Sequence, residues 1–226
     1  MKPKDLKPPF KKDSKEVFLD LSEGVLYIPE RVERKNLKEE IKKYFSSFNC
    51  IHLEFCSGNG EWLHKKALEH PEILWIGVEK QFKRVRKIWS KAKNSELKNI
   101  FIVSGEALEF SENYLYDDCI DQIYINFPDP WPKNKHAKFR LIQSHFTAQM
   151  SRILKEGGHV NFLTDDFNYS KQAISVLLTE KSFLTEFDHP HYHSDLGDYG
   201  SSYFRRLWEE KKRSFYFSKF QKTCKY

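Results

Sequence analysis

The stretch IHLEFCSGNGEWL, residues 51–63, joins a short apolar run, a turn with two glycines and the start of a helix. Its first five residues are typical of a buried β-strand. Gly58 and Gly60 permit the left-handed backbone that a tight turn between strand and helix requires. A strand that leads directly into a helix is the first half of a βαβ unit. The stretch therefore predicts an α/β fold with a ligand-binding turn at a strand end.

The same alternation continues along the chain. We expect further strands at 73–79, 99–103, 120–127 and 158–164, with helices over 37–48, from about 60, over 81–93, over 138–155 and from 168 to about 180. Continuous apolar strands separated by helices are typical of a doubly wound, mainly parallel sheet. Strand-like pieces at 183–188 and 214–220 could pair as an antiparallel edge.

Length and composition limit the possible classes of protein. The chain has 226 residues, of which 39% are hydrophobic and 15% aromatic, enough to bury the core of one α/β domain. Residues 1–16 contain six lysines and three prolines, so we predict a basic N-terminal tail and lead-in over 1–36 and a single domain over 37–226. The longest apolar run is far shorter than a membrane span, which favours a cytoplasmic protein without a membrane partner.

Cysteine and histidine spacing gives little support for a metal site. The four cysteines contain no C-x-x-C pair. His189, His191 and His193 could ligate a metal, because alternate residues of an extended segment face the same side. No second ligand group accompanies them, so a polar loop is the simpler interpretation and we expect no metal.

Acidic residues lie at the ends of the first three of these strands. Glu54 ends the first, Glu79 the second, and Glu106 follows the third. Glu79 could accept hydrogen bonds from ribose hydroxyls and Glu106 from an adenine amine, although Glu106 could also be an ordinary helix N-terminal acid. Glu54 would repel phosphate and suit a cationic amino group, while Leu63 occupies the third glycine position of a dinucleotide loop. This pattern favours S-adenosyl-L-methionine over a dinucleotide.

The segment INFPDPWPK, residues 125–133, follows the fourth strand. Pro128 and Pro130 restrict the backbone on both sides of Asp129, and Trp131 is available for stacking. Residues 133–140 then carry four cations and no acid, which is typical of a nucleic-acid surface, with a solvated helix entrance as the alternative. Residues 80–98 carry eight cations and one acid, some of which we expect only to solvate the outer face of a helix.

With these motifs the chain resembles, over about residues 50–216, the bacterial tRNA (guanine-N7-)-methyltransferase family. The resemblance implies a Rossmann-like class I methyltransferase fold with a seven-stranded sheet and an antiparallel edge strand. It also implies S-adenosyl-L-methionine as the cofactor, tRNA as the partner, and methyl transfer to N7 of a guanosine in the variable loop.

The same resemblance assigns the site residues. Asp129 would be catalytic. The cofactor would be bound by Glu54, Gly58, Gly60, Glu79, Glu106 and Asp129. The substrate would be bound by Lys133, Asp165, Ser201 and Tyr203, and RNA would be contacted by Lys135, His136, Lys138 and Arg140.

Two positions depart from the family's pattern. Cys56 replaces the first glycine of the loop, which is tolerable if its φ is negative, and Phe204 replaces the glutamate of a T-x-Y-E motif. They leave open a tRNA-binding homologue with weak or lost methyl transfer. A nicotinamide-dependent oxidoreductase is a third alternative, disfavoured by Leu63 and Glu54. Either a monomer or a homodimer is compatible with the sequence.

Overall fold

The computed structural model describes residues 1–6, 15–30, 35–197, 199–200 and 203–223. These form two compact units, residues 1–116 and 117–226, called here the first and second units. In the part of the chain that is described, no helix is both long and apolar enough to cross a membrane. The division into residues 1–36 and 37–226 stays a prediction.

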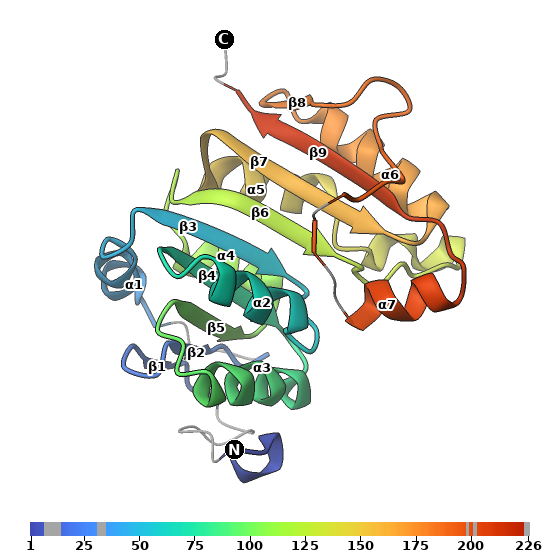
Figure 1. The fold of residues 1–226 in the computed structure, drawn as a ribbon. Coiled ribbons are helices and arrows are strands. Elements are labelled where there is room, and N and C mark those ends of the chain that lie inside the picture. The colour runs from blue at the N-terminus through green and yellow to red at the C-terminus, as the bar shows by residue number, and fades with distance from the viewer. Residues whose placement is uncertain (7–14, 31–34, 198, 201–202, 224–226) are drawn as a thin grey trace. The chain divides into compact units, whose positions relative to one another are not determined.

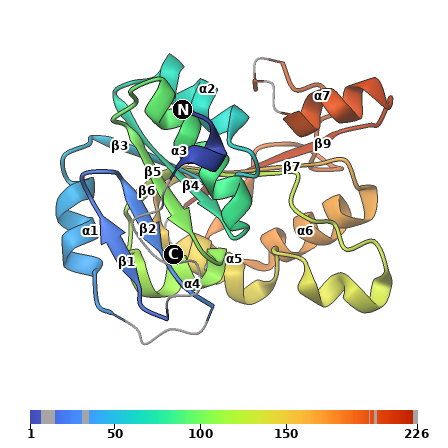
Figure 2. The same cartoon turned by 90° about the horizontal axis from the view of Figure 1, so that it is seen from below.

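The first unit is a sheet with helices on both faces (Figures 1 and 2). The strand order is β1-β2-β5-β4-β3, parallel except for β1. The strands are β1 (Phe18–Asp20), β2 (Val25–Tyr27), β3 (Cys50–Phe55), β4 (Ile73–Glu79) and β5 (Ile100–Ser104). The helices are the 3-10 helix η1 (Pro3–Asp5) and the α-helices α1 (Lys38–Phe45), α2 (Glu61–Glu69), α3 (Phe82–Asn94) and α4 (Ala107–Tyr114). Figure 2 shows α2 and α3 on one face of this sheet and α1 and α4 on the other.

The second unit has the strand order β6-β7-β9-β8. β6 and β7 are parallel, and β9 runs antiparallel to both β7 and β8, so the predicted antiparallel pairing is confirmed. The strands are β6 (Ile120–Asn126), β7 (Leu154–Thr164), β8 (Phe183–Thr185) and β9 (Tyr216–Lys222). The helices are the 3-10 helix η2 (Asn134–Phe139) and the α-helices α5 (Ser144–Ile153), α6 (Phe167–Thr179) and α7 (Tyr203–Glu210). In Figure 1, α5 and α6 lie behind the strands of this unit.

The predicted α/β class is confirmed, but the predicted strand count is wrong. The described residues contain nine strands where seven were expected, because β1 and β2 lie within the range assigned to a tail and lead-in. They form an antiparallel pair around Gly24, whose φ is 62°, and β2 adds to the parallel edge beside β5. Two three-residue strands are too short for a periodicity argument to detect.

The helix predicted over 138–155 is also wrong in its bounds. Residues 134–139 form η2, and α5 begins only at residue 144. The Gln143 side chain donates to the carbonyl oxygens of Ala137 (2.9 Å) and Arg140 (3.3 Å). In a continuous helix, backbone amides would donate to these two oxygens instead. β7 begins at 154 rather than 158, because Leu154 already pairs with Ile120 before a register shift.

A close contact between α2 and β4 explains why Leu63 replaces a glycine. Leu63 is fully buried on α2 and packs over Gly77 of β4, where an added Cβ would lie 2.4 Å from the Leu63 Cδ2 atom. Close packing of helix on strand is the usual purpose of the third glycine in a dinucleotide loop. Here the glycine is on the strand, and the helix supplies the side chain.

We therefore predict that Gly77→Ala lowers the free energy of unfolding by about 1–3 kcal/mol, through overpacking against Leu63. Leu63→Ala alone leaves a cavity and costs about 2–5 kcal/mol. Because the two changes share one space, the double variant loses less than their sum, as urea denaturation would show. Strictly additive losses would contradict the contact.

Candidate functional site

The loop between β3 and α2, residues 56–60, has three residues with left-handed backbone. Cys56, Gly58 and Gly60 have φ values of 59°, 56° and 67°. The negative φ that would make Cys56 tolerable is therefore not observed, and a non-glycine residue in this conformation costs about 1–2 kcal/mol. The Gly60 amide donates to the carbonyl oxygen of Ser57 (2.8 Å), which closes the turn before α2.

Glu79 holds this loop to the end of β4. One of its carboxylate oxygens accepts from the Gly58 amide (2.9 Å) and the other from the Gln81 amide (2.7 Å). The side chain is only 4% exposed, and burial raises the pKa of its carboxyl group, opposed by these amides and by Arg84 at 3.7 Å. Glu79 thus joins two strand ends and presents a carboxylate there.

Glu54 and Glu106 lie near the same loop. Glu54, at the end of β3, is only 2% exposed. Glu106 precedes α4 without a side-chain hydrogen bond that caps it, and lies 3.5 Å from the Lys80 ammonium group. Glu106 thus lies at the N-terminus of α4, so its alternative role as an ordinary helix N-terminal acid stays open.

The pKa of the Cys56 thiol depends on the charged groups around it. Its pKa is raised to about 12, first by burial and then by the negative charges of Glu79, Glu54 and Glu106, with Lys80 opposing them. The structure therefore brings the three predicted acids of the first unit to one place. Such a site repels phosphate and accepts hydrogen bonds from hydroxyl and ammonium groups.

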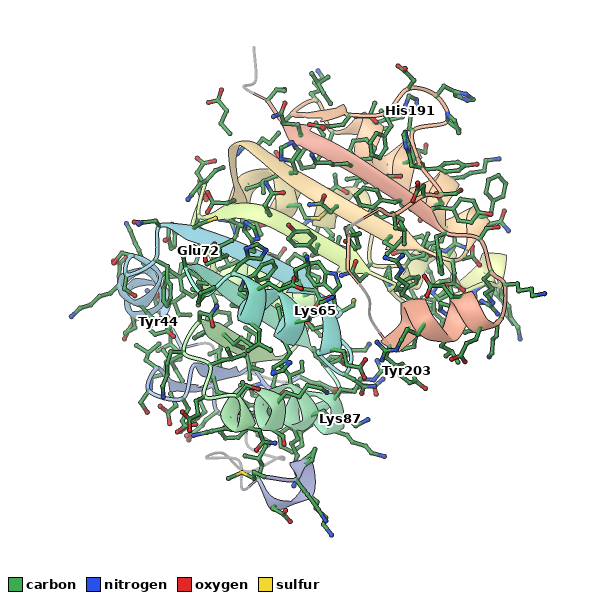
Figure 3. All side chains as sticks on the ribbon, viewed as in Figure 1. Tyr44, Lys65, Glu72, Lys87, His191 and Tyr203 are labelled. Atoms are coloured by element: carbon green, nitrogen blue, oxygen red, sulfur yellow. The ribbon has the colours of Figure 1, made fainter. Side chains whose placement is uncertain are left out.

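Two lysines of α3 hold the loop from its other side, a contact that the sequence analysis missed. Lys87, labelled in Figure 3, donates to the Asn59 side-chain oxygen (3.0 Å), and Lys91 donates to the Asn59 carbonyl oxygen (2.8 Å). Burial lowers the pKa of Lys91. No sequence signal distinguishes these two lysines from their neighbours, since which cations face the loop depends on how α3 packs.

In the second unit, Asp129 lies in residues 127–131, called here the Asp129 segment, which has a left-handed residue at each end. Phe127 and Trp131 have φ values of 49° and 41°, and each such residue costs about 1–3 kcal/mol. The Phe127 amide donates to the carbonyl oxygen of Leu163 (2.8 Å), while the Asp129 side chain is exposed between the two prolines. The backbone is thus held in a costly conformation that presents a carboxylate to solvent.

Residues 133–140, called here the basic run, have an exposed part and a buried part. Lys133, Lys135 and Lys138 are exposed, and His136 lies 5.8 Å from Trp131 between ring centroids. Arg140 differs, since it is only 6% exposed and donates to the carbonyl oxygen of Pro130 (2.8 Å).

Three of the four predicted substrate residues are described. Lys133 lies in the exposed part of the basic run. Asp165 follows β7 and pairs with Arg213, whose guanidinium group lies 4.0 Å from the centroid of the Trp208 ring. Tyr203, labelled in Figure 3, begins α7 and is 43% exposed. Ser201 lies outside the described residues.

Phe204 follows Tyr203 on α7, and its ring centroid lies 6.5 Å from that of Phe127. An aromatic contact to the start of the Asp129 segment therefore stands where the family's pattern has a glutamate.

The histidine segment 189–193 contains no helix or strand. His191 Nδ1 lies 2.8 Å from the carbonyl oxygen of Phe187, and the His189 and His191 rings are 5.8 Å apart. Among the residues that the structure describes, no group of three or more His, Cys, Asp or Glu side chains could hold a metal ion.

The raised thiol pKa predicts a pH dependence of stability. Cys56 stays protonated in the folded chain until about pH 12, whereas an ordinary thiol ionises near pH 9. Above pH 9 the unfolded chain therefore binds fewer protons, and stability falls as the pH rises. The free energy of unfolding of Cys56→Gly and of Cys56→Ser, each taken relative to wild type, should rise by about 1.4 kcal/mol from pH 7.5 to pH 10. Urea unfolding at the two pH values measures this change.

Only the glycine variant also relieves the left-handed strain, so it should be the more stable of the two at both pH values. A constant difference between wild type and Cys56→Ser from pH 7.5 to pH 10 would contradict the raised pKa of the Cys56 thiol.

Comparison with known proteins gives the family. The family model Methyltransf_4, described as "Putative methyltransferase", matches residues 49–217. The tRNA (guanine-N(7)-)-methyltransferase of Chlamydia abortus is 41% identical over 224 residues, 98% of each chain, and that of Chlamydia felis is 40% identical over 228 residues, the full length of both. The Staphylococcus aureus (strain Mu3) protein of the same name is 37% identical over 139 residues, 60% of this chain and 64% of its own.

Solved structures agree on the fold. One titled "Structure of an Antibiotic Related Methyltransferase" matches with a TM-score of 0.59 and 19% identity, covering 85% of this chain and 96% of its own. A 30S ribosomal A1408 methyltransferase from an uncultured bacterium matches with a TM-score of 0.58 and 16% identity, covering 84% and 96%. The predicted class I methyltransferase fold is confirmed. The chain belongs to the tRNA (guanine-N(7)-)-methyltransferase family.

Proposed function

We propose that this protein transfers the methyl group of S-adenosyl-L-methionine to N7 of a guanosine in the variable loop of tRNA. One observation carries the proposal. The chain is 41% identical to the tRNA (guanine-N(7)-)-methyltransferase of Chlamydia abortus, and its Asp129 is exposed on a backbone segment with a left-handed residue at each end. Such strain persists where the surroundings hold it in place, and it is concentrated at functional sites.

The loop of residues 56–60, with Glu54, Glu79 and Glu106 around it, fits S-adenosyl-L-methionine. Glu79 would accept from the ribose hydroxyls, since each carboxylate oxygen that binds a backbone amide retains a second lone pair. Glu54 would accept from the ammonium group and Glu106 from the adenine amine, while Gly58 and Gly60 allow close approach of the backbone. When bound, the cofactor supplies an electrophilic methyl group on a positively charged sulfur.

The reaction at guanine N7 needs little from the protein beyond alignment and charge. N7 has a lone pair and no proton, so no general base is required, and holding the purine in line supplies much of the acceleration. The methylated purine is cationic, so the carboxylates of Asp129 and Asp165 would stabilise charge that develops during transfer. Either carboxylate could also accept from guanine N1–H and the exocyclic amine, which adenine does not present in that pattern.

The exposed part of the basic run would hold the tRNA. Lys133, Lys135 and Lys138 are free to approach phosphates, and the Trp131 and Phe139 rings, 5.4 Å apart between centroids, offer a stacking surface. Phe139 is 55% exposed, so its ring is accessible to a base. We further propose that the protein acts in the cytoplasm as a monomer or homodimer and without a metal.

The direct test is to incubate the protein with methyl-labelled S-adenosyl-L-methionine and unmodified tRNA, then to digest the tRNA and identify the labelled nucleoside. N7-methylguanosine is expected, and its yield should fall when the variable-loop guanosines are replaced by adenosine. A protein that binds both ligands and forms no N7-methylguanosine would instead be the tRNA-binding homologue that Cys56 and Phe204 leave open.

Asp129→Ala should lower kcat at least 100-fold, because a carboxylate that would stabilise the developing charge is removed. Its Kd for tRNA should change by less than about threefold, since a carboxylate contributes no phosphate contact. Asp117→Ala, which removes an exposed acid that pairs with Arg152 just before β6, is the matched control. An Asp129→Ala variant with normal kcat would contradict the assigned role.

Lys133→Ala should mainly weaken tRNA binding. Loss of one phosphate contact lowers the slope of log K against log salt by roughly 0.7–0.9, which a salt titration would measure. The matched control is Lys65→Ala, an exposed α2 lysine paired with Glu69 (Figure 3). Equal salt slopes for Lys133→Ala and Lys65→Ala would argue against an RNA contact at Lys133.

A further inference from the structure

Arg140 is the buried member of the basic run. It is 6% exposed, whereas Lys133, Lys135 and Lys138 are exposed. We propose that Arg140 is a positioning residue for methyl transfer: its guanidinium group fixes the backbone that presents Asp129 and does not contact RNA phosphate. The proposal rests on the proposed function, and it divides the run into an RNA-facing part and a supporting residue.

Arg140 bonds directly to the backbone of the Asp129 segment. Arg140 Nε donates to the carbonyl oxygen of Pro130 at 2.8 Å. That carbonyl belongs to the peptide group that joins Pro130 to Trp131, whose φ is 41°. Fixing the carbonyl fixes the plane of this peptide group, and therefore the left-handed backbone at Trp131.

The other end of the segment is fixed separately. The Phe127 amide donates to the carbonyl oxygen of Leu163 in β7, and the Phe127 ring lies 5.7 Å from the Phe215 ring between centroids. A strained segment keeps one conformation only when both ends are held. Arg140 supplies the attachment on the Trp131 side.

Arg140 is itself held by α6. Its guanidinium carbon lies 5.1 Å from the centroid of the Tyr169 ring, and Tyr169 is fully buried. The Tyr169 hydroxyl accepts from the Ile142 amide (3.2 Å), and the Tyr169 amide donates to Asp166 (2.7 Å), the residue after Asp165. Arg140 thus connects the segment that carries Asp129 with the start of the helix that follows Asp165.

The residue type fits this role. A planar guanidinium group can stack on an aromatic face while its edge donates to a carbonyl oxygen, which an ammonium group cannot do in the same way. A phosphate contact would instead require the charged group at the surface, as in Lys138, whose ammonium group lies over the exposed Phe139 ring at 5.3 Å.

The test compares Arg140→Met and Arg140→Lys with two other variants. Arg152→Met removes a guanidinium group that pairs with Asp117 and bonds Gln149, and serves as the structural control. Lys138→Met removes an exposed cation. For each variant we would measure kcat and Kd for tRNA, the salt slope of binding, and hydrogen exchange of the backbone amides of residues 127–143.

We expect Arg140→Met to lower kcat at least tenfold, with Kd within twofold of wild type and an unchanged salt slope. Amide exchange in residues 127–143 should be at least tenfold faster, and Arg140→Lys, which keeps a donor, should fall between wild type and Arg140→Met in both measurements. Lys138→Met should lose affinity and salt slope. Arg152→Met should change neither kcat nor exchange in this segment.

An Arg140→Met variant that binds tRNA more weakly with a reduced salt slope and keeps normal kcat would overturn the proposal. If Arg140→Met fails to fold, normal kcat and exchange in Arg140→Lys would overturn it equally. If wild-type protein forms no N7-methylguanosine, the proposed function fails, while the exchange comparison still decides whether Arg140 holds the segment.

Discussion

Burial of parallel strands on both faces is the constraint on which the rest of the structure depends. Ile76 and Phe101 in the first unit, and Ile125 and Phe162 in the second, are fully buried, so the strands themselves offer little polar chemistry. Burying an unpaired charge is costly, so the ends of these strands, where the chain turns toward a helix, are the places suited to a charged ligand site. Glu54, at the end of β3, and Asp129, just beyond β6, mark such ends.

Strand ends become useful sites only when their loops are held rigidly. In the first unit the loop with residues 56–60 is held by the carboxylate of Glu79 on one side and by Lys87 and Lys91 on the other. In the second unit the Asp129 segment is held by Leu163 and Arg140. Each loop contains at least one left-handed non-glycine residue, whose cost the surrounding bonds must offset.

The net charge of +6 conceals two populations of charge with different tasks. Carboxylates gather around the Cys56 thiol, whose pKa is raised first by burial and then by their negative charges. Cations serve either the surface or the interior: Lys135 and Lys138 are exposed, whereas Lys91 and Arg140 bond to backbone carbonyls of the two loops. A basic run in a sequence is therefore not one surface, because burial separates its members.

The sequence by itself determined what local spacing encodes. The buried strands, the glycine turn at Gly58 and Gly60, the acids at strand ends and the Pro-Asp-Pro segment all depend on neighbours within a few residues. Apart from the early start of β7, the structure has them at the expected positions in the chain. The short strands β1 and β2 were missed because three residues carry no readable period.

Only the tertiary structure decided which groups meet across distance in the chain. Helix packing decides three such contacts: Leu63 packs over Gly77, Lys91 donates to the Asn59 carbonyl oxygen, and Arg140 donates to the Pro130 carbonyl oxygen. The left-handed backbone of Cys56 likewise needs the folded loop to impose it. Packing and burial assign these roles, and neither is a property of residue type or spacing alone.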